Sequence, residues 1–196
     1  LFDVYKRAVV ARATSGNRED DPILSLEWHE DELFALYQSQ KLCCLSYSPT
    51  FSDTSKQFSH IVCLWTVTIP APYNRMSLDP HNHDKILFSG SGASFSVYKL
   101  SETGGPPNPA LKIVTLNGAG NVNDATWSIH LPNYIFLLTD SELFLFDTIT
   151  QGVTPMTQHK RSASSFSTLM QFSTNDKCIY IIHKSGTMSI LNIEIP

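Results

Sequence analysis

An internal repeat of about 47 residues limits what this 196-residue chain can fold into more than any other feature of its sequence. Four segments resemble one another, and each is expected to form a short strand that ends in a large apolar residue. These segments are 23–28, 74–80, 122–128 and 166–173. Their terminal apolar residues follow one another at spacings of 50, 49 and 45 residues, and are Trp28, Leu78, Trp127 and Phe172. Such a period is typical of folds built from repeated supersecondary units.

A second pattern keeps the same period. Triplets with an apolar, a bulky and a polar residue are centred on Phe2, Trp65, Tyr98, Phe146 and Leu191. The interval that ends at Trp65 is long and the next is short, which an insertion ahead of Trp65 explains. Residues 48–59 have the polar, serine-rich composition of a loop. We therefore expect each triplet to lie on the third strand of its repeat. The residues that we interpret as structural anchors of the repeats are Trp28, Trp65, Leu78, Tyr98, Trp127, Phe146, Phe172 and Leu191.

The segments between the anchors predict further strands. Runs of consecutive apolar residues suit strands that are covered on both faces, and they occupy 33–38, 85–91, 134–140 and 178–184. More mixed segments suit an outer, half-exposed strand, and they occupy 8–14, 110–116 and 152–158. No segment has a sustained apolar stripe at helical spacing.

Four short strands at this period predict an all-β fold, a WD40-like β-propeller with about four degenerate four-stranded blades. The blade pieces are expected at approximately 1–16, 22–72, 73–118, 122–158 and 166–196. The chain starts within a third strand and without a signal peptide, so we interpret it as a partial propeller from a longer polypeptide. A solenoid and a β-sandwich are the alternative folds.

Composition excludes several classes of function. The formal net charge is −4 and only 16% of residues are charged, which argues against a nucleic-acid groove or an anionic membrane surface as partner. No apolar run approaches the ~18 residues of a membrane span. The four cysteines form no CxxC pair, which favours reduced thiols in an intracellular protein.

Residues 79–84 form the densest polar cluster. His81 and His83, flanked by carboxylates, are weak candidates for zinc ligands, but no matched third ligand follows. A tight turn between two strands is the favoured interpretation, because Pro, Asn and Asp are turn formers. Residues 90–94 are expected to form a hairpin turn, and the proline-rich residues 104–109 a stiff surface loop. No GxSxG motif occurs, and we predict no enzyme and no cofactor.

Residues 59–194 resemble the WD-repeat region of the cilia- and flagella-associated proteins of axonemal doublets. The similar segments are SHIVCLWTV (59–67), MSLDPHNHDKILFSGSGASFSVYKL (76–100), VNDATWSIHLPNYIFLLTDSELFLFDT (122–148) and FSTLMQFSTNDKCIYIIHKSGTMSILNIE (166–194). Residues 140–142 stand where that group has a glycine-containing turn. The resemblance implies paired propellers followed by coiled coils, with a role in tethering or regulating inner-arm dynein and ciliary beating.

The leading hypothesis is a non-catalytic scaffold that binds other proteins of a large assembly in the cytoplasmic cytoskeleton, the axoneme of a cilium or flagellum. A scaffold of a transport, coat or other cytosolic assembly is the alternative. A propeller hydrolase is a remote alternative, because it needs convergent carboxylates or histidines on the inner strands. Those strands instead start at Pro22, Asn74, Val122 and Phe166.

Overall fold

The computed structural model describes residues 2–3, 8–9, 21–50, 58–70, 72–90, 94–115, 122–139, 142–156, 166–171, 178–183 and 186–192. Every regular element in these ranges is a β-strand, and the all-β prediction is confirmed. No helix there is long and apolar enough to cross a membrane. The chain divides into two compact units, Leu1–Pro72 and Tyr73–Pro196.

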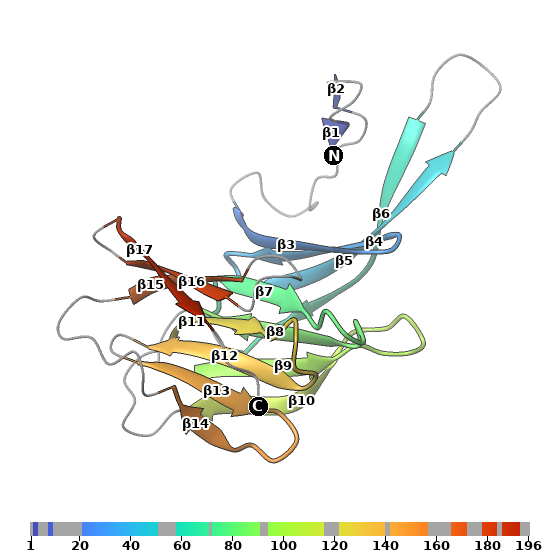
Figure 1. Ribbon diagram of the computed structural model, residues 1–196. Coiled ribbons are helices and arrows are strands. Elements are labelled where there is room, and N and C mark those ends of the chain that lie inside the picture. The colour runs from blue at the N-terminus through green and yellow to red at the C-terminus, as the bar shows by residue number, and fades with distance from the viewer. Residues whose placement is uncertain are drawn as a thin grey trace. The chain divides into compact units, whose positions relative to one another are not determined.

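The first unit contains one complete four-stranded sheet. Its strands are β3 (Ile23–His29), β4 (Glu32–Tyr37), β5 (Lys41–Thr50) and β6 (Phe58–Thr68), paired in chain order and antiparallel. The short strands β1 (Phe2–Asp3) and β2 (Ala8–Val9) pair separately. Because each strand pairs with the next one along the chain, the sheet is a simple meander (Figure 1).

The second unit repeats this meander. One sheet contains β7 (Arg75–Leu78), β8 (Lys85–Ser89), β9 (Ser94–Lys99) and β10 (Asn108–Thr115). The next contains β11 (Val122–Trp127), β12 (Tyr134–Thr139), β13 (Leu143–Asp147) and β14 (Val153–Pro155). The last contains β15 (Phe166–Gln171), β16 (Cys178–His183) and β17 (Met188–Asn192). The predicted apolar second strands are confirmed as β4, β8, β12 and β16.

Consecutive apolar residues in the second strands are buried on both faces. In β12 the residues from Ile135 to Thr139 are all buried, and in β8 so are those from Ile86 to Ser89. Leu87, Phe95 and Val97 of one sheet belong to the same core cluster as Trp127 and Ile135 of the next. On its other side, β12 contributes Phe136 and Leu138 to a second cluster with Ile179 and Ile181 of β16. Each sheet of this unit therefore packs against its neighbour, as blades do.

Strand register explains the repeat in the sequence. In each sheet one row of directly paired residues crosses the first three strands. The rows are Trp28–Leu33–Leu45, Leu78–Ile86–Tyr98, Trp127–Ile135–Phe146 and Gln171–Ile179–Leu191. Gln171 thus occupies the pairing position that the sequence pattern assigned to its neighbour Phe172, which lies outside the described residues.

The prediction that Trp65 lies on a third strand is wrong. Trp65 lies on the outer strand β6, where it pairs with Cys44, and Leu45 of β5 occupies the third-strand position. The prediction failed because an outer strand, in which apolar and polar side chains alternate, shows the same apolar–bulky–polar pattern as a third strand. The segment predicted as a loop ahead of Trp65 also includes paired strand ends, since Ser48 pairs with His60 and Thr50 with Phe58. Residues 51–57 lie outside the described ranges.

Candidate functional site

The turn between β7 and β8 is organised by Asp79. The buried Asp79 accepts a hydrogen bond from the His81 amide on Oδ1 at 2.9 Å, and its own carbonyl accepts one from the His83 amide at 3.0 Å. The Asp79 amide donates to the Lys85 carbonyl at 2.9 Å. Side chains of Asp commonly close turns in this way. The favoured turn interpretation of residues 79–84 is therefore confirmed.

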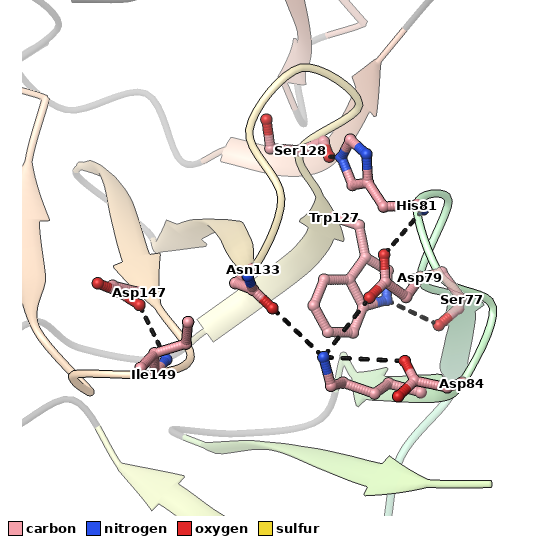
Figure 2. A network of polar contacts seen from close by, with 10 residues as sticks. Ser77, Asp79, His81, Asp84, Trp127, Ser128, Asn133, Asp147 and Ile149 are labelled. Carbon is pink, nitrogen blue, oxygen red and sulfur yellow. Dashed lines mark hydrogen bonds and ion pairs between the residues drawn. The ribbon is translucent and has the colours of Figure 1, made fainter.

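Lys85 connects this turn to the next blade. Its Nζ lies 3.8 Å from Asp79 Oδ2 and 3.8 Å from Asp84 Oδ1, and it donates to Asn133 Oδ1 at 3.3 Å (Figure 2). Asn133 lies in the turn between β11 and β12, at a positive φ of 67°. One ammonium group therefore faces two carboxyl groups.

Two further hydrogen bonds join the same pair of blades. The Trp127 indole Nε1 donates to the Ser77 carbonyl at 3.1 Å, and His81 Nε2 lies 2.9 Å from the Ser128 carbonyl (Figure 2). A carbonyl oxygen only accepts, so His81 Nε2 carries the hydrogen of this bond. This polar cluster, made of Asp79, His81, Asp84, Lys85 and Asn133, therefore holds two blades together at one end of their strands.

The candidate zinc ligands have other roles in this turn. His81 uses Nε2 for the bond to Ser128, and His83 occupies a turn position with a φ of 54°. Across the part of the chain that the structure describes, no group of three or more His, Cys, Asp or Glu residues is placed to hold a metal ion. The contacts described for this turn are therefore those of a structural link between two blades.

The inner strands contain a charged pair that the sequence patterns did not single out. The Arg75 guanidinium of β7 contacts the carboxylate of Asp124 on β11, and Asp124 is 1% exposed while the Arg75 side chain is 46% exposed. Both residues lie three positions before an anchor, Leu78 and Trp127 respectively. Opposite charges at one repeat position in consecutive blades are the signal that would have predicted the pair.

The anchors differ in exposure. Trp127, Tyr98 and Phe146 are buried, and the Phe146 ring packs edge-on against Phe95 with centroids 5.0 Å apart. Trp28 is 45% exposed, although it occupies the same row position as Trp127. The expectation that Trp28 is a core residue of a blade therefore differs from what the structure shows. Leu191 lies on β17, and nothing is described of its side chain.

Strand β3 of the first unit has apolar side chains that are exposed. Successive side chains of a strand point to opposite faces, so Leu24, Leu26 and Trp28 share one face. All three are exposed, and Leu26 is 52% exposed. In the second unit, Met188 and Ile190 of β17 are likewise exposed. Contiguous apolar surface of this kind is typical of protein-interaction sites.

The remaining predicted loops contribute little chemistry. Gly90 directly follows β8 and has a φ of 103°, a conformation that favours glycine, while residues 91–93 lie outside the described ranges. In the proline-rich connection, the Gly104 amide donates to the Ser101 carbonyl at 3.1 Å, and this forms a turn before β10. Asp21 accepts hydrogen bonds from the amide and hydroxyl of Ser39, at 2.9 and 2.6 Å.

Comparison with known proteins identifies the fold. No protein-family model matches the chain. No curated protein sequence matches it. The crystal structure of the computationally designed Ika4 protein is similar, with a TM-score of 0.56 and 12% identity over 91% of this chain and 95% of that one. The crystal structure of Chaetomium thermophilum Sqt1 is similar with a TM-score of 0.62 and 13% identity. That match covers 88% of this chain and 45% of Sqt1, so the chain spans less than half the length of Sqt1.

Likeness at this level of identity shows the fold alone. The chain is a partial WD40-like propeller, with four-stranded antiparallel sheets that form its blades. The propeller prediction is confirmed.

Proposed function

We propose that the chain is a non-catalytic scaffold that binds neighbouring proteins of the ciliary or flagellar axoneme. The observation that carries the scaffold proposal is the exposed apolar face of β3, formed by Leu24, Leu26 and Trp28. Interface cores are enriched in aromatic residues and depleted in charged ones, and this face has the required composition. Trp28, whose indole is held by a hydrogen bond to the Glu30 carbonyl at 2.6 Å, would be its central contact residue.

The axonemal part of the proposal has a separate support. It rests on the resemblance of residues 59–194 to the WD-repeat region of cilia- and flagella-associated proteins. On this proposal the scaffold tethers or regulates inner-arm dynein, and it resides in the axoneme. The low charge fraction of the chain agrees with binding to proteins and not to nucleic acid.

Affinity purification of the full-length protein from ciliated cells tests both parts. Bound proteins would be quantified by mass spectrometry, and we expect axonemal dyneins and doublet proteins in stoichiometric amounts. Stoichiometric recovery of coat, transport or nuclear proteins without axonemal ones would leave a scaffold but refute the axonemal assignment.

A matched pair of variants tests the binding face. Leu26→Asp places a charge on the apolar face of β3 and is expected to remove most of the bound protein. Ile149→Asp is the control, because Ile149 is 73% exposed but lies in the turn between β13 and β14. Equal losses in the two variants would contradict a role for the β3 face.

A further inference from the structure

Cys43 and Cys63 lie close together on the β5–β6 hairpin of the first unit. The Cys43 Sγ lies 3.3 Å from the Thr66 hydroxyl oxygen, and the Cys63 Sγ lies 3.5 Å from the same oxygen. A single hydroxyl therefore contacts both sulfur atoms.

Strand register explains why the two sulfurs share a face. Cys43 pairs with Thr66, and Leu45 pairs with Cys63, but the pairing shifts between Cys44 and Leu45. The shift adds one residue to β6, so Cys63 and Thr66 point the same way although they are three positions apart. Leu45 packs against the core cluster that contains Cys43, and Cys63 pairs with Leu45 across the hairpin.

The two thiols differ in access. Cys63 is exposed, whereas Cys43 is 7% exposed and belongs to the core cluster with Ala35 and Tyr37. Burial raises the pKa of the Cys43 thiol, and burial beside Glu32 raises that of Cys44 to about 12. A reagent in solution therefore reaches Cys63 first, and Cys44 stays protonated and inert at neutral pH.

We propose that Cys43 and Cys63 form a dithiol site that small-molecule disulfides such as oxidised glutathione convert to an intramolecular disulfide. The Cys63 thiolate attacks one sulfur of oxidised glutathione and releases one glutathione thiolate. The Cys43 thiolate then attacks the Cys63 sulfur of the mixed disulfide and releases the second. Both protein thiols are oxidised, and the two glutathione thiolates take up their protons. The new bond covalently links strands β5 and β6.

Mass spectrometry of the full chain tests the site. The protein would be incubated with oxidised glutathione, quenched in acid, alkylated and digested without reduction. We expect the loss of two hydrogen masses from the intact chain and a cross-linked peptide pair that contains Cys43 and Cys63. Dithiothreitol should reverse both changes.

Two variants make the assignment specific. Cys44→Ser should form the same cross-link, which distinguishes Cys43 from its neighbour. Cys63→Ser, a change at an exposed position, should form none and should leave Cys43 free for alkylation after unfolding. Persistence of glutathione on Cys63 with Cys43 still alkylatable would overturn the proposal. A cross-link to Cys178 or between two molecules in place of the Cys43–Cys63 link would also overturn it.

Discussion

Gly90 has both a backbone conformation and a neighbour that favour glycine alone. Its φ is 103°, and a Cβ at this position would overlap the side-chain oxygen of Asn74. We expect Gly90→Ala to lower the free energy of unfolding by about 1–3 kcal/mol, because a φ of 103° strains an L residue and the Asn74 side chain must move away from the added Cβ. Gly104→Ala is the control, since Gly104 has a φ of 74° but no atom within 4 Å of the added Cβ. We expect a loss of about 1 kcal/mol there.

Urea unfolding followed by circular dichroism measures both glycine variants. If Gly90→Ala costs no more than Gly104→Ala, the contact with Asn74 contributes nothing to the requirement for glycine.

Asp147 makes stability depend on pH. Hydrogen bonds from the Ile149 amide at 2.8 Å and from the Thr150 hydroxyl at 2.8 Å lower the pKa of this carboxyl group below its ordinary value. A pKa that is lower in the folded state means that the ionised form stabilises the fold above the unfolded pKa. This stabilisation is lost as the pH falls from the unfolded pKa of ~4 through the folded pKa.

The variant Asp147→Asn lacks the titration and tests this assignment. We expect its urea midpoint to lie below that of the unmodified protein at about pH 7, and the difference to shrink as the pH falls below about 4. Thr150→Ala should show a smaller change of the same sign, because it removes only one of the hydrogen bonds. A difference that stays constant across this pH range would contradict the role of Asp147.

At the scale of the strand, two tryptophans that occupy equivalent positions in two sheets have different surroundings, and we expect them to contribute differently to stability. Trp127 of β11 is 2% exposed and donates to the Ser77 carbonyl of the neighbouring blade, whereas Trp28 of β3 is exposed and bonds within its own turn. We expect Trp127→Phe to cost about 2–3 kcal/mol, since it leaves a small cavity and an unsatisfied carbonyl. Trp28→Phe should cost less than about 1 kcal/mol.

Unfolding of both variants in urea, followed by circular dichroism, gives this comparison. Equal costs would mean that the inter-blade bond to Ser77 contributes no measurable stability, or that the Trp28 face is covered in solution. Partner binding, measured for the unmodified protein and for the Trp28→Phe variant, distinguishes these two explanations.

Strands could be predicted from the sequence where their pairing and burial produce a recognisable pattern of neighbouring residues. Consecutive apolar residues marked β8 and β12 because both faces of these strands are buried. Trp65 was assigned to the wrong strand because bulky residues occur on outer strands as well, and only pairing with Cys44 distinguishes the two. Turn formers between Asp79 and Asp84 predicted the turn, but not the contact of Lys85 with Asn133, 48 residues away. Such contacts depend on how blades pack, which sequence periodicity does not encode.

For the chain as a whole, the low fraction of charged residues and the exposed apolar strand faces favour binding through apolar contact. Only 16% of the residues are charged, and the net charge is −4. The polar cluster between β7–β8 and β11–β12 uses its single cation internally, since Lys85 is held by Asp79, Asp84 and Asn133. On the proposed function, we therefore expect apolar contact to contribute more to partner binding than long-range electrostatic attraction does.

Salt dependence tests this conclusion on a partner recovered by affinity purification. Exposed charge pairs are screened within a Debye length of about 8 Å at physiological ionic strength, whereas burial of apolar surface does not weaken with added salt. We expect the dissociation constant to change by less than about threefold between about 0.15 and 0.5 M sodium chloride. Leu26→Asp should weaken binding at both salt concentrations, and Ile149→Asp should not.

A protein that binds through several phosphate or carboxylate contacts would lose affinity by orders of magnitude over such a range. A loss of more than about tenfold would therefore place the interface on charged groups and away from the β3 face.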